Sequence, residues 1–245
     1  MEKQMEILTR IDRALESDQE LRDQEAVRMP NLADRMSAAG RCYRDRWFSL
    51  HGFEMDPGGG FSRNPKLLRV FRLGNAIESE VIALLELWAG FIIKDEQLEV
   101  GSGKWVGHID GLIDMGRDGV PDWCLLEVKS AKAARFELLR ELGSYEAWSN
   151  QYAAQIHAYL HHLDGITDAI VIVYNKDTSE LYAERIVYDL DEAMRLEKES
   201  ALVTSEGSAP PPRPVEAKTQ YGAFCKWCDF NQTCWGGAVD VEFDD

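Results

Sequence analysis

The chain has 245 residues, of which 45% are hydrophobic, and its formal net charge is −16. This length suffices for one large domain with a packed core, or for one domain with a small appendage. The net charge argues against a protein that coats nucleic acid through bulk electrostatics, since that mode needs many Lys and Arg contacts to phosphate, but it leaves local DNA binding open. No apolar stretch approaches the ~20 residues that cross a membrane, and residues 1–28 do not resemble a secretory signal. We therefore expect a cytoplasmic globular protein without membrane contact, in which five cysteines stay reduced and favour metal binding over disulfides.

Hydrophobic periodicity and turn residues predict alternating helical and extended segments. In chain order, the predicted elements are helices at 4–28, 31–50 and 67–87, extended segments at 91–100, 105–115 and 123–128, a long helix at 135–163, and strands at 169–174 and 181–188. The segments 105–115 and 123–128 flank the turn sequence "GRDGVP" and are expected to form a hairpin. This order indicates an α/β domain with a mixed sheet of about four strands and helices on its faces.

Composition divides the chain into five parts. We expect an acidic N-terminal helix in 1–30, the main domain in 31–204, a Pro-rich linker in 205–217, a cysteine-rich module in 218–236 and an acidic tail in 237–245. The linker sequence "SEGSAPPPRPVE" cannot continue a preceding helix, because proline lacks the backbone donor that a helix needs.

Two charged residues end an apolar run in "CLLEVKS", where Glu127 and Lys129 lie two positions apart and therefore share one face of a strand. Asp110, in "GHIDG", lies on the preceding strand of the expected hairpin. Buried charges are costly unless they are paired or bind a metal. Two carboxylates suit Mg²⁺ or Mn²⁺, and a neighbouring lysine can hold the attacking water and offset charge on a scissile phosphate.

Asp110 followed by Glu127-Val128-Lys129 resembles the PD-(D/E)xK nuclease motif. The resemblance implies a restriction-endonuclease-like mixed sheet flanked by helices. It also implies that Asp110, Glu127 and the Val128 carbonyl hold the catalytic cation, and that Lys129 positions the water.

Two further motifs resemble particular branches of these nucleases. In "QIHAY", Gln155 and Tyr159 share a helical face and are similar to the QxxxY motif of the RecB-like branch, which implies that they orient the substrate strand. In "GNAIE", Glu78 resembles the acidic residue of the GxxxE element of lambda-type exonucleases, which implies an additional metal ligand. Relatives of the RecB branch that carry an iron–sulfur cluster usually have histidine there, so Glu80 and His108 remain alternatives to Glu78.

Three cysteines near the C-terminus, Cys225, Cys228 and Cys234, have the spacing C-x₂-C-x₅-C in a segment with little else to fold around. A metal centre is a natural way to hold such a segment, and Cys42 is the best fourth ligand. One distant N-terminal cysteine and three C-terminal ones are similar to the iron–sulfur nucleases of the RecB-like branch, namely the AddB nuclease domain and the CRISPR-associated RecB-type exonucleases. The resemblance implies a [4Fe–4S] cluster that ties the C-terminal module to the N-terminal helical region. Structural zinc remains the alternative.

Basic residues gather in three short clusters, which are expected to form a track for DNA phosphates. The clusters are Arg41, Arg44 and Arg46; Arg63, Lys66, Arg69 and Arg72; and Lys129, Lys132 and Arg135.

Together the motifs imply a metal-dependent DNA exonuclease that acts on single-stranded or frayed ends in recombination, repair or CRISPR adaptation, with protein partners from such a complex. Two other classes stay open: a non-catalytic subunit that holds DNA ends, and an acidic protein that mimics DNA.

Overall fold

The computed structural model describes residues 2–28, 33–57, 65–116, 118–207, 209–222, 224–226 and 228–236. The predicted acidic tail at 237–245 and Arg63 of the second basic cluster lie outside the described residues. None of the described helices is both long enough and apolar enough to cross a membrane.

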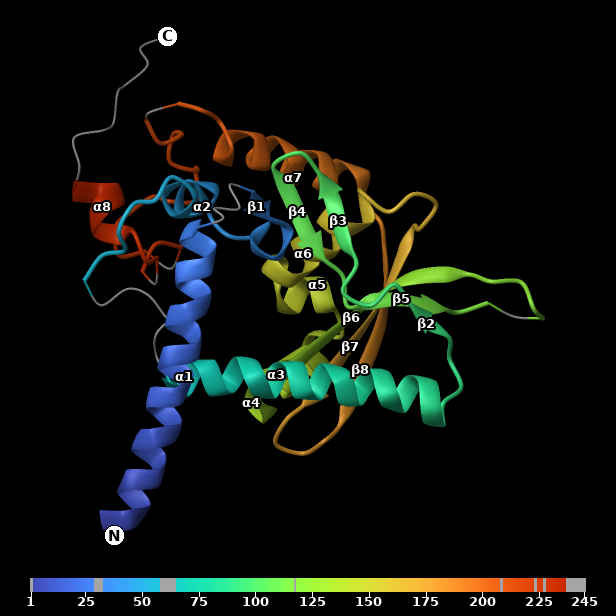
Figure 1. The fold of residues 1–245 in the computed structure, drawn as a ribbon. Helices are drawn as coiled ribbons and strands as arrows, with labels where there is room; N and C mark the ends of the chain where they lie inside the picture. Colours follow the sequence, from blue (N-terminus) through green and yellow to red (C-terminus); the bar gives the residue numbers. More distant parts are fainter. Residues whose placement is uncertain are drawn as a thin grey trace.

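A mixed five-stranded sheet forms the centre of the molecule, with strand order β2-β5-β6-β7-β8 (Figure 1). Its strands are β2 (Ile93–Lys94), β5 (Gly111–Asp114), β6 (Trp123–Ala131), β7 (Asp168–Asn175) and β8 (Leu181–Val187). The middle pair, β6 and β7, is parallel, whereas the other neighbouring pairs are antiparallel. The predicted hairpin and the two later strands are thus confirmed, but the sheet has five strands rather than four.

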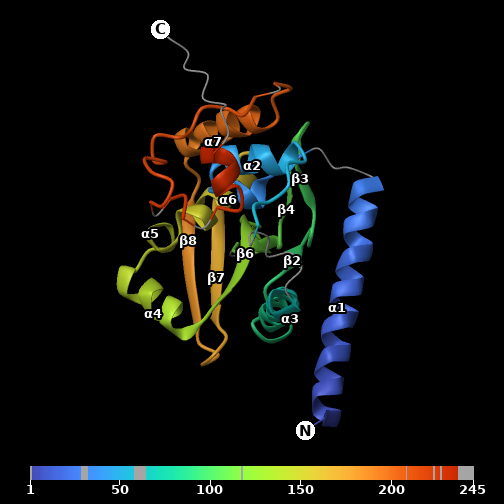
Figure 2. The same cartoon turned by 90° about the vertical axis from the view of Figure 1, so that its left-hand side faces the viewer.

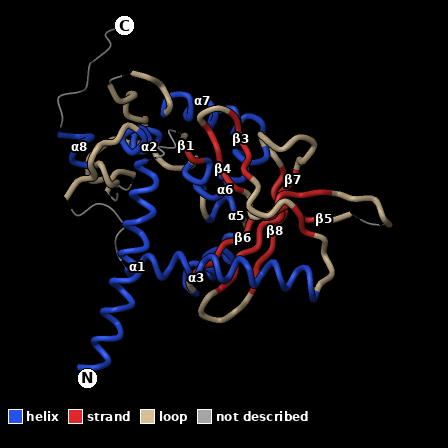
Figure 3. Tube along the Cα trace, viewed as in Figure 1, coloured by secondary structure: helices blue, strands red, loops and turns tan. Residues whose placement is uncertain are grey.

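Helices cover both faces of this sheet, which confirms the expected mixed sheet flanked by helices (Figures 1 and 3). The described helices of the molecule are α1 (Glu2–Arg28), α2 (Tyr43–Leu50), α3 (Pro65–Ala83), α4 (Ala133–Leu142), α5 (Tyr145–Trp148), α6 (Asn150–Leu160), α7 (Leu190–Val203) and α8 (Asn231–Gly236). A short 3₁₀ turn, η1 (Met36–Ala38), precedes α2, and a π-helical turn, η2 (Leu84–Trp88), continues α3.

Successive residues of β6 point to opposite faces of the sheet, and each face has its own part of the hydrophobic core. Leu125 packs with buried residues of α4, α6 and α7 on one face, and Leu126 packs with residues of α3 on the other. Because neighbouring strand residues point to opposite faces, Glu127 and Lys129 point to the face that α6 covers.

The sequence prediction of one long helix at 135–163 is wrong, because the chain turns twice within it. Gly143 ends α4 in the left-handed conformation at φ 60°, which a residue with a Cβ adopts at a cost. Ser149 then begins α6, and its side chain accepts a hydrogen bond from the backbone N–H of Tyr152. Because of these two breaks, α6 is a separate helix and not a continuation of α4.

Two other predicted elements are also divided. The segment expected as one helix at 31–50 contains a two-residue strand, β1 (Asp34–Arg35), as well as η1 and α2. The segment expected as one strand at 105–115 is two strands, because β4 (Trp105–His108) joins β1 and β3 (Glu99–Ser102) in a separate three-stranded sheet. The chain crosses from this sheet to the central one at Ile109 and Asp110, and that crossing places Asp110 beside β6.

The C-terminal segment packs on α2. Phe230 stacks on Phe48 with ring centroids 5.5 Å apart, and together with Trp47 they form a small buried cluster. Asp56 accepts hydrogen bonds from the backbone N–H and the hydroxyl of Thr233, at 3.1 and 2.7 Å. The C-terminal segment is therefore joined to the beginning of the main domain by direct contacts.

Helix α1 crosses the outer side of α3 and lies away from the central sheet, as Figures 1 and 2 show. An ion pair between Arg69 and Asp12 links the two helices.

Candidate active site

The pairing of β5 with β6 brings Asp110 next to Glu127. Gly111 pairs with Leu126, so the residue before Gly111 stands beside the residue after Leu126. The backbone N–H of Val128 donates a hydrogen bond of 2.8 Å to Asp110 Oδ2. This bond fixes the first carboxylate at the edge of β6.

Glu127 is fully buried, and its two carboxylate oxygens have different surroundings. Oε1 accepts hydrogen bonds from Lys129 Nζ and, at 2.9 Å, from Gln155 Nε2. Oε2 is buried and has no hydrogen-bond partner among the described residues. A buried carboxylate oxygen without a donor is costly, so Oε2 is available to a ligand that brings positive charge.

Helix α6 supplies the polar groups that face these charges. Gln155 Nε2 also donates to Tyr159 Oη at 3.0 Å, so one amide connects Glu127 with the tyrosine. The ring of Tyr159 lies directly against Gly107 of β4, where a Cβ would come within 2.4 Å of Tyr159 Cε1. The structure therefore brings both predicted α6 residues to the site, and close packing against a glycine holds the tyrosine there.

Glu78 on α3 contributes a third carboxyl group. It is half-buried, and Gln97 Nε2 donates to its Oε1 at 2.8 Å. The alternative Glu80 is exposed on the same helix, and the alternative His108 pairs with Glu99 of β3 at 3.6 Å. Of the three candidates, Glu78 is the one whose charge acts on Asp110 and Glu127. Sequence reasoning missed Gln97, which has no motif and lies in a turn at φ 55°.

The three carboxyl groups hold their protons more tightly than usual. Burial, followed by the charge of Asp110, raises the pKa of Glu78 to about 7. Burial likewise raises the pKa of Glu127 and of Asp110, against the opposing effect of Lys129. Burial lowers the pKa of Lys129, but the neighbouring carboxylates outweigh this effect and raise it above its usual value. The site thus has an excess of negative charge that one ammonium group does not balance.

The donors suit a hard divalent cation, since they are carboxylate oxygens with the Val128 carbonyl beside them. Within the described residues, no three His, Cys, Asp or Glu side chains already converge closely enough to hold an ion. In the present arrangement Lys129 Nζ contacts Glu127 directly, and its side chain is 21% exposed. The unpaired Glu127 Oε2 and the raised carboxyl pKa values nevertheless fit a cation at this position.

All four predicted cysteine ligands line one pocket between α2 and the C-terminal segment, which brings Cys42 together with Cys225, Cys228 and Cys234. Cys124, by contrast, is buried in β6 and packs with the α3 side of the core. The structure therefore separates the fifth cysteine from the other four.

Two thiols in this pocket hold their protons strongly. Burial raises the pKa of Cys42 to about 11 and that of Cys228 to about 12; the charge of the nearby Asp45 adds to both effects. The Cys228 thiol donates a hydrogen bond of 3.6 Å to Asp45 Oδ1. A metal that binds here must displace these protons, which makes metal binding by the pocket pH-dependent.

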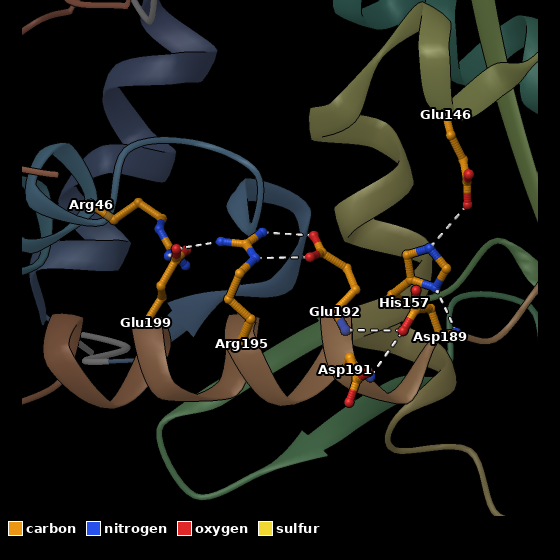
Figure 4. A network of polar contacts seen from close by, with 8 residues as sticks. All are labelled: Arg46, Glu146, His157, Asp189, Asp191, Glu192, Arg195 and Glu199. Atoms are coloured by element: carbon orange, nitrogen blue, oxygen red, sulfur yellow. Dashed lines mark hydrogen bonds and ion pairs between the residues drawn. The ribbon is translucent and has the colours of Figure 1, made fainter. Parts of the chain in front are cut away.

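The expected phosphate track is wrong for its first cluster, because two of its arginines are buried in internal contacts. Arg46 pairs with Asp34 at 2.7 Å and with Glu199 of α7 at 3.5 Å. Arg44 donates at 3.0 Å to the backbone carbonyl of Pro211. Figure 4 shows how the Arg46–Glu199 pair continues through Arg195 along α7. These arginines hold α2 against α7 and the C-terminal segment, so they are not available to DNA.

No family model matches the chain, and no curated protein matches its sequence. Among solved structures, the alkaline exonuclease LHK-Exo from Laribacter hongkongensis is similar over 68% of this chain and 87% of its own, with 16% identity and a TM-score of 0.45. LHK-Exo in complex with dAMP matches over 69% and 88%, with 15% identity and a TM-score of 0.43. SSO0001 matches over 82% of this chain and 84% of its own, with 17% identity and a TM-score of 0.44. The function proposed below rests on the geometry of the site itself.

Proposed function

We propose that the chain is a metal-dependent nuclease of the PD-(D/E)xK type that hydrolyses DNA phosphodiester bonds. The observation that carries this proposal is the buried Oε2 of Glu127, which has no hydrogen-bond partner among the described residues and lies in a set of carboxyl groups with raised pKa values. A site that only stabilised the fold would be expected to pair this oxygen. A site that binds a cation would leave it open.

Asp110, Glu127 and the Val128 carbonyl would hold Mg²⁺ or Mn²⁺, with Glu78 as an additional ligand. When bound, the cation supplies Lewis acidity toward the phosphate and a more acidic water. Gln155 keeps Glu127 in place through its 2.9 Å hydrogen bond, and Tyr159 orients the amide by accepting from it at 3.0 Å. Both side chains are buried, so they would act on the substrate strand through Glu127 rather than by touching it.

Lys129 acts as a charged donor rather than as a base. Its raised pKa keeps the ammonium group protonated at neutral pH, so Nζ can donate to the attacking water and offset the charge that develops on the phosphate. Glu127 accepts from the same ammonium group and fixes its direction.

The substrate that we propose is a single-stranded or frayed DNA end, and the reaction is exonucleolytic. We propose that this RecB-like enzyme acts in the cytoplasm, with protein partners of a recombination, repair or CRISPR adaptation complex. The −16 net charge fits a contact confined to the site, because it disfavours binding along the whole surface.

We also propose that Cys42, Cys225, Cys228 and Cys234 hold a [4Fe–4S] cluster. Their common pocket supports a shared ligand, and the unequal spacing of the cysteines favours iron–sulfur over paired zinc knuckles. Such a cluster would stabilise the packing of the C-terminal segment on α2.

The test is to incubate anaerobically purified protein with end-labelled single- and double-stranded DNA in Mn²⁺, Mg²⁺ or chelator. We expect mononucleotides or short products from single-stranded ends in either metal, and intact DNA in chelator. Binding without cleavage in both metals would favour the subunit that holds DNA ends. The absence of both binding and cleavage would favour the acidic DNA mimic.

A further inference from the structure

Tyr152 lies beside the candidate active site although no motif singles it out. Its ring centroid is 5.4 Å from Lys129 Nζ. Tyr152 is half-buried in the first turn of α6, three residues before Gln155 and seven before Tyr159. Residues at these spacings share one face of a helix, so the ring belongs to the same face as the two proposed site residues.

Two buried rings support Tyr152 from behind. Trp148 lies 5.7 Å and Tyr145 6.4 Å from it between ring centroids. Tyr145 is fully buried and Trp148 is 6% exposed, so of the three rings Tyr152 is the one with an accessible surface. Packing of this kind restricts the ring to few rotamers, so that little conformational entropy is lost when a ligand covers it.

An exposed cation extends the same surface. The guanidinium of Arg135 lies 4.9 Å from the Trp148 ring centroid, and its Nη2 donates to the Trp148 carbonyl at 3.0 Å. Lys129 therefore lies beside the Tyr152 ring and Arg135 beside the neighbouring Trp148 ring, so each of the two adjacent rings has a cation next to it. Alternating cations and aromatic faces are characteristic of surfaces that follow a single nucleic-acid strand.

We propose that Tyr152 is a stacking platform for the base of the nucleotide whose phosphate contacts Lys129. The inference rests on the proposed function, because it requires a phosphate at Lys129. A base can lie flat on a tyrosine only if it has left the stack of a duplex, so Tyr152 selects an unpaired nucleotide. Every base has a π-face, so this selection is independent of sequence.

The binding test uses a single-stranded oligonucleotide with 2-aminopurine at its terminal nucleotide, in Ca²⁺ to occupy the oxygen site without cleavage. Stacking on Tyr152 quenches the fluorescence of this base. We expect Tyr152→Ala to abolish the quenching and to weaken binding about 10-fold, the scale of one stacked base. Tyr152→Phe keeps the ring and should stay within about 2-fold of wild type, and equal circular dichroism spectra of wild type and Tyr152→Ala exclude loss of folding as the cause. Trp88→Ala is the matched aromatic control, since Trp88 is 83% exposed and lies outside the site.

An abasic terminal nucleotide separates stacking from an effect on Lys129. If Tyr152 stacks on the base, wild type should lose about 10-fold in affinity for the abasic strand, and Tyr152→Ala should lose nothing more. An equal loss for Tyr152→Ala on normal and abasic strands would overturn the inference, since the ring would then act through Lys129. Cleavage of normal strands by wild type in Mn²⁺ is measured in parallel. Its absence would contradict the proposed nuclease, whereas cleavage with no effect of Tyr152→Ala on binding or quenching would contradict the platform alone.

Discussion

The carboxylate site and the cysteine pocket are built in different ways. Regular structure positions the first, in which Glu127 and Lys129 lie in the middle of the sheet and Gln155 reaches them from α6. The second is lined by the N-cap residue of α2, Cys42, and by a C-terminal segment that includes the six-residue helix α8. The fold alone therefore assembles the carboxylates, whereas the proposed cluster would add to the packing around the thiols.

More apolar surface is buried around the carboxylate site than around the cysteine pocket. The sheet has a large core on each face, but the cluster under the cysteine pocket consists of Trp47, Phe48 and Phe230. A small cluster supplies little hydrophobic stabilisation, and hydrogen bonds such as those to Asp56 add about 1 kcal/mol each. We therefore expect changes at the two regions to have separable effects, one on chemistry and the other on stability and metal content.

Asp110→Asn should have the largest effect on cleavage without any effect on stability or metal content. The substitution keeps an acceptor for the Val128 N–H but removes one charge that the cation needs, so cleavage should fall by about 10³-fold or more. Iron content and Tm should stay at the wild-type values, because the change relieves repulsion between carboxylates. Rates in Mn²⁺ and circular dichroism melts measure the two outcomes. A parallel loss of iron would show that the two regions are not independent.

Lys129→Ala should have the next largest effect. Loss of a charged donor to the transition state should reduce the single-turnover rate about 10²- to 10³-fold. The Mn²⁺ concentration for half-maximal rate should stay the same or fall, because the ammonium group no longer competes for Glu127. Lys198→Ala is the matched control, since Lys198 is an exposed lysine on α7 that belongs to neither the site nor the basic clusters. Wild-type cleavage by Lys129→Ala would contradict the role given to this residue.

A substitution in the cysteine pocket should affect stability and metal content. Cys42→Ala should reduce iron and acid-labile sulfide from about four of each per chain to a minor fraction, and it should expose the C-terminal segment to protease. Cys124→Ala also removes one cysteine but leaves the pocket intact, so its iron content should match wild type. Stoichiometric zinc without sulfide in the wild-type protein would show that the four cysteines hold zinc and not an iron–sulfur cluster.

The smallest predicted effect is a pH dependence of stability in chelator. The folded protein holds Glu78 at a pKa of about 7, above the ~4.3 of an unfolded glutamate. The folded state therefore binds more protons between these values, and the free energy of unfolding falls as pH rises from about 5 to 8. Tm should fall with it, by ~2 to 4 °C for each kcal/mol.

A pair of matched variants separates this effect from general acidic repulsion. Glu78→Gln should flatten the decline of Tm with pH more than Glu80→Gln, which removes the same charge from an exposed position of the same helix. Equal slopes for the two variants would show that Glu78 does not titrate as a buried group.

Local periodicity was sufficient to predict the parts of the site that lie within single elements. The alternation of Leu125 and Leu126 in β6 predicts the face of Glu127, and the four-residue spacing of Gln155 and Tyr159 predicts that they lie together. Tyr152 has the same helical signal, three residues before Gln155, and it could have been found from it.

Features that depend on distant partners could not be predicted in this way. Burial alternates from Trp105 through Asp110, so the sequence pattern runs on without a break although the chain changes sheets there. Arg46 looks like a surface cation because its partners Asp34 and Glu199 are 12 and 153 residues away in the chain. Gln97 acquires its role from a tertiary hydrogen bond to Glu78, which no short spacing encodes.

The proposed nuclease activity requires a divalent cation held by the carboxylates around Glu127. Its most direct test is the release of label from a single-stranded end by wild type and Glu127→Gln, purified side by side, over a Mn²⁺ titration. Glutamine still accepts a hydrogen bond from Lys129 but cannot supply the charge of the carboxylate, so Glu127→Gln should stay inactive at every Mn²⁺ concentration while wild type saturates. Equal activity of the two proteins would show that cleavage does not need the Glu127 carboxylate. Activity of wild type that persists in chelator would show that cleavage does not need a divalent cation.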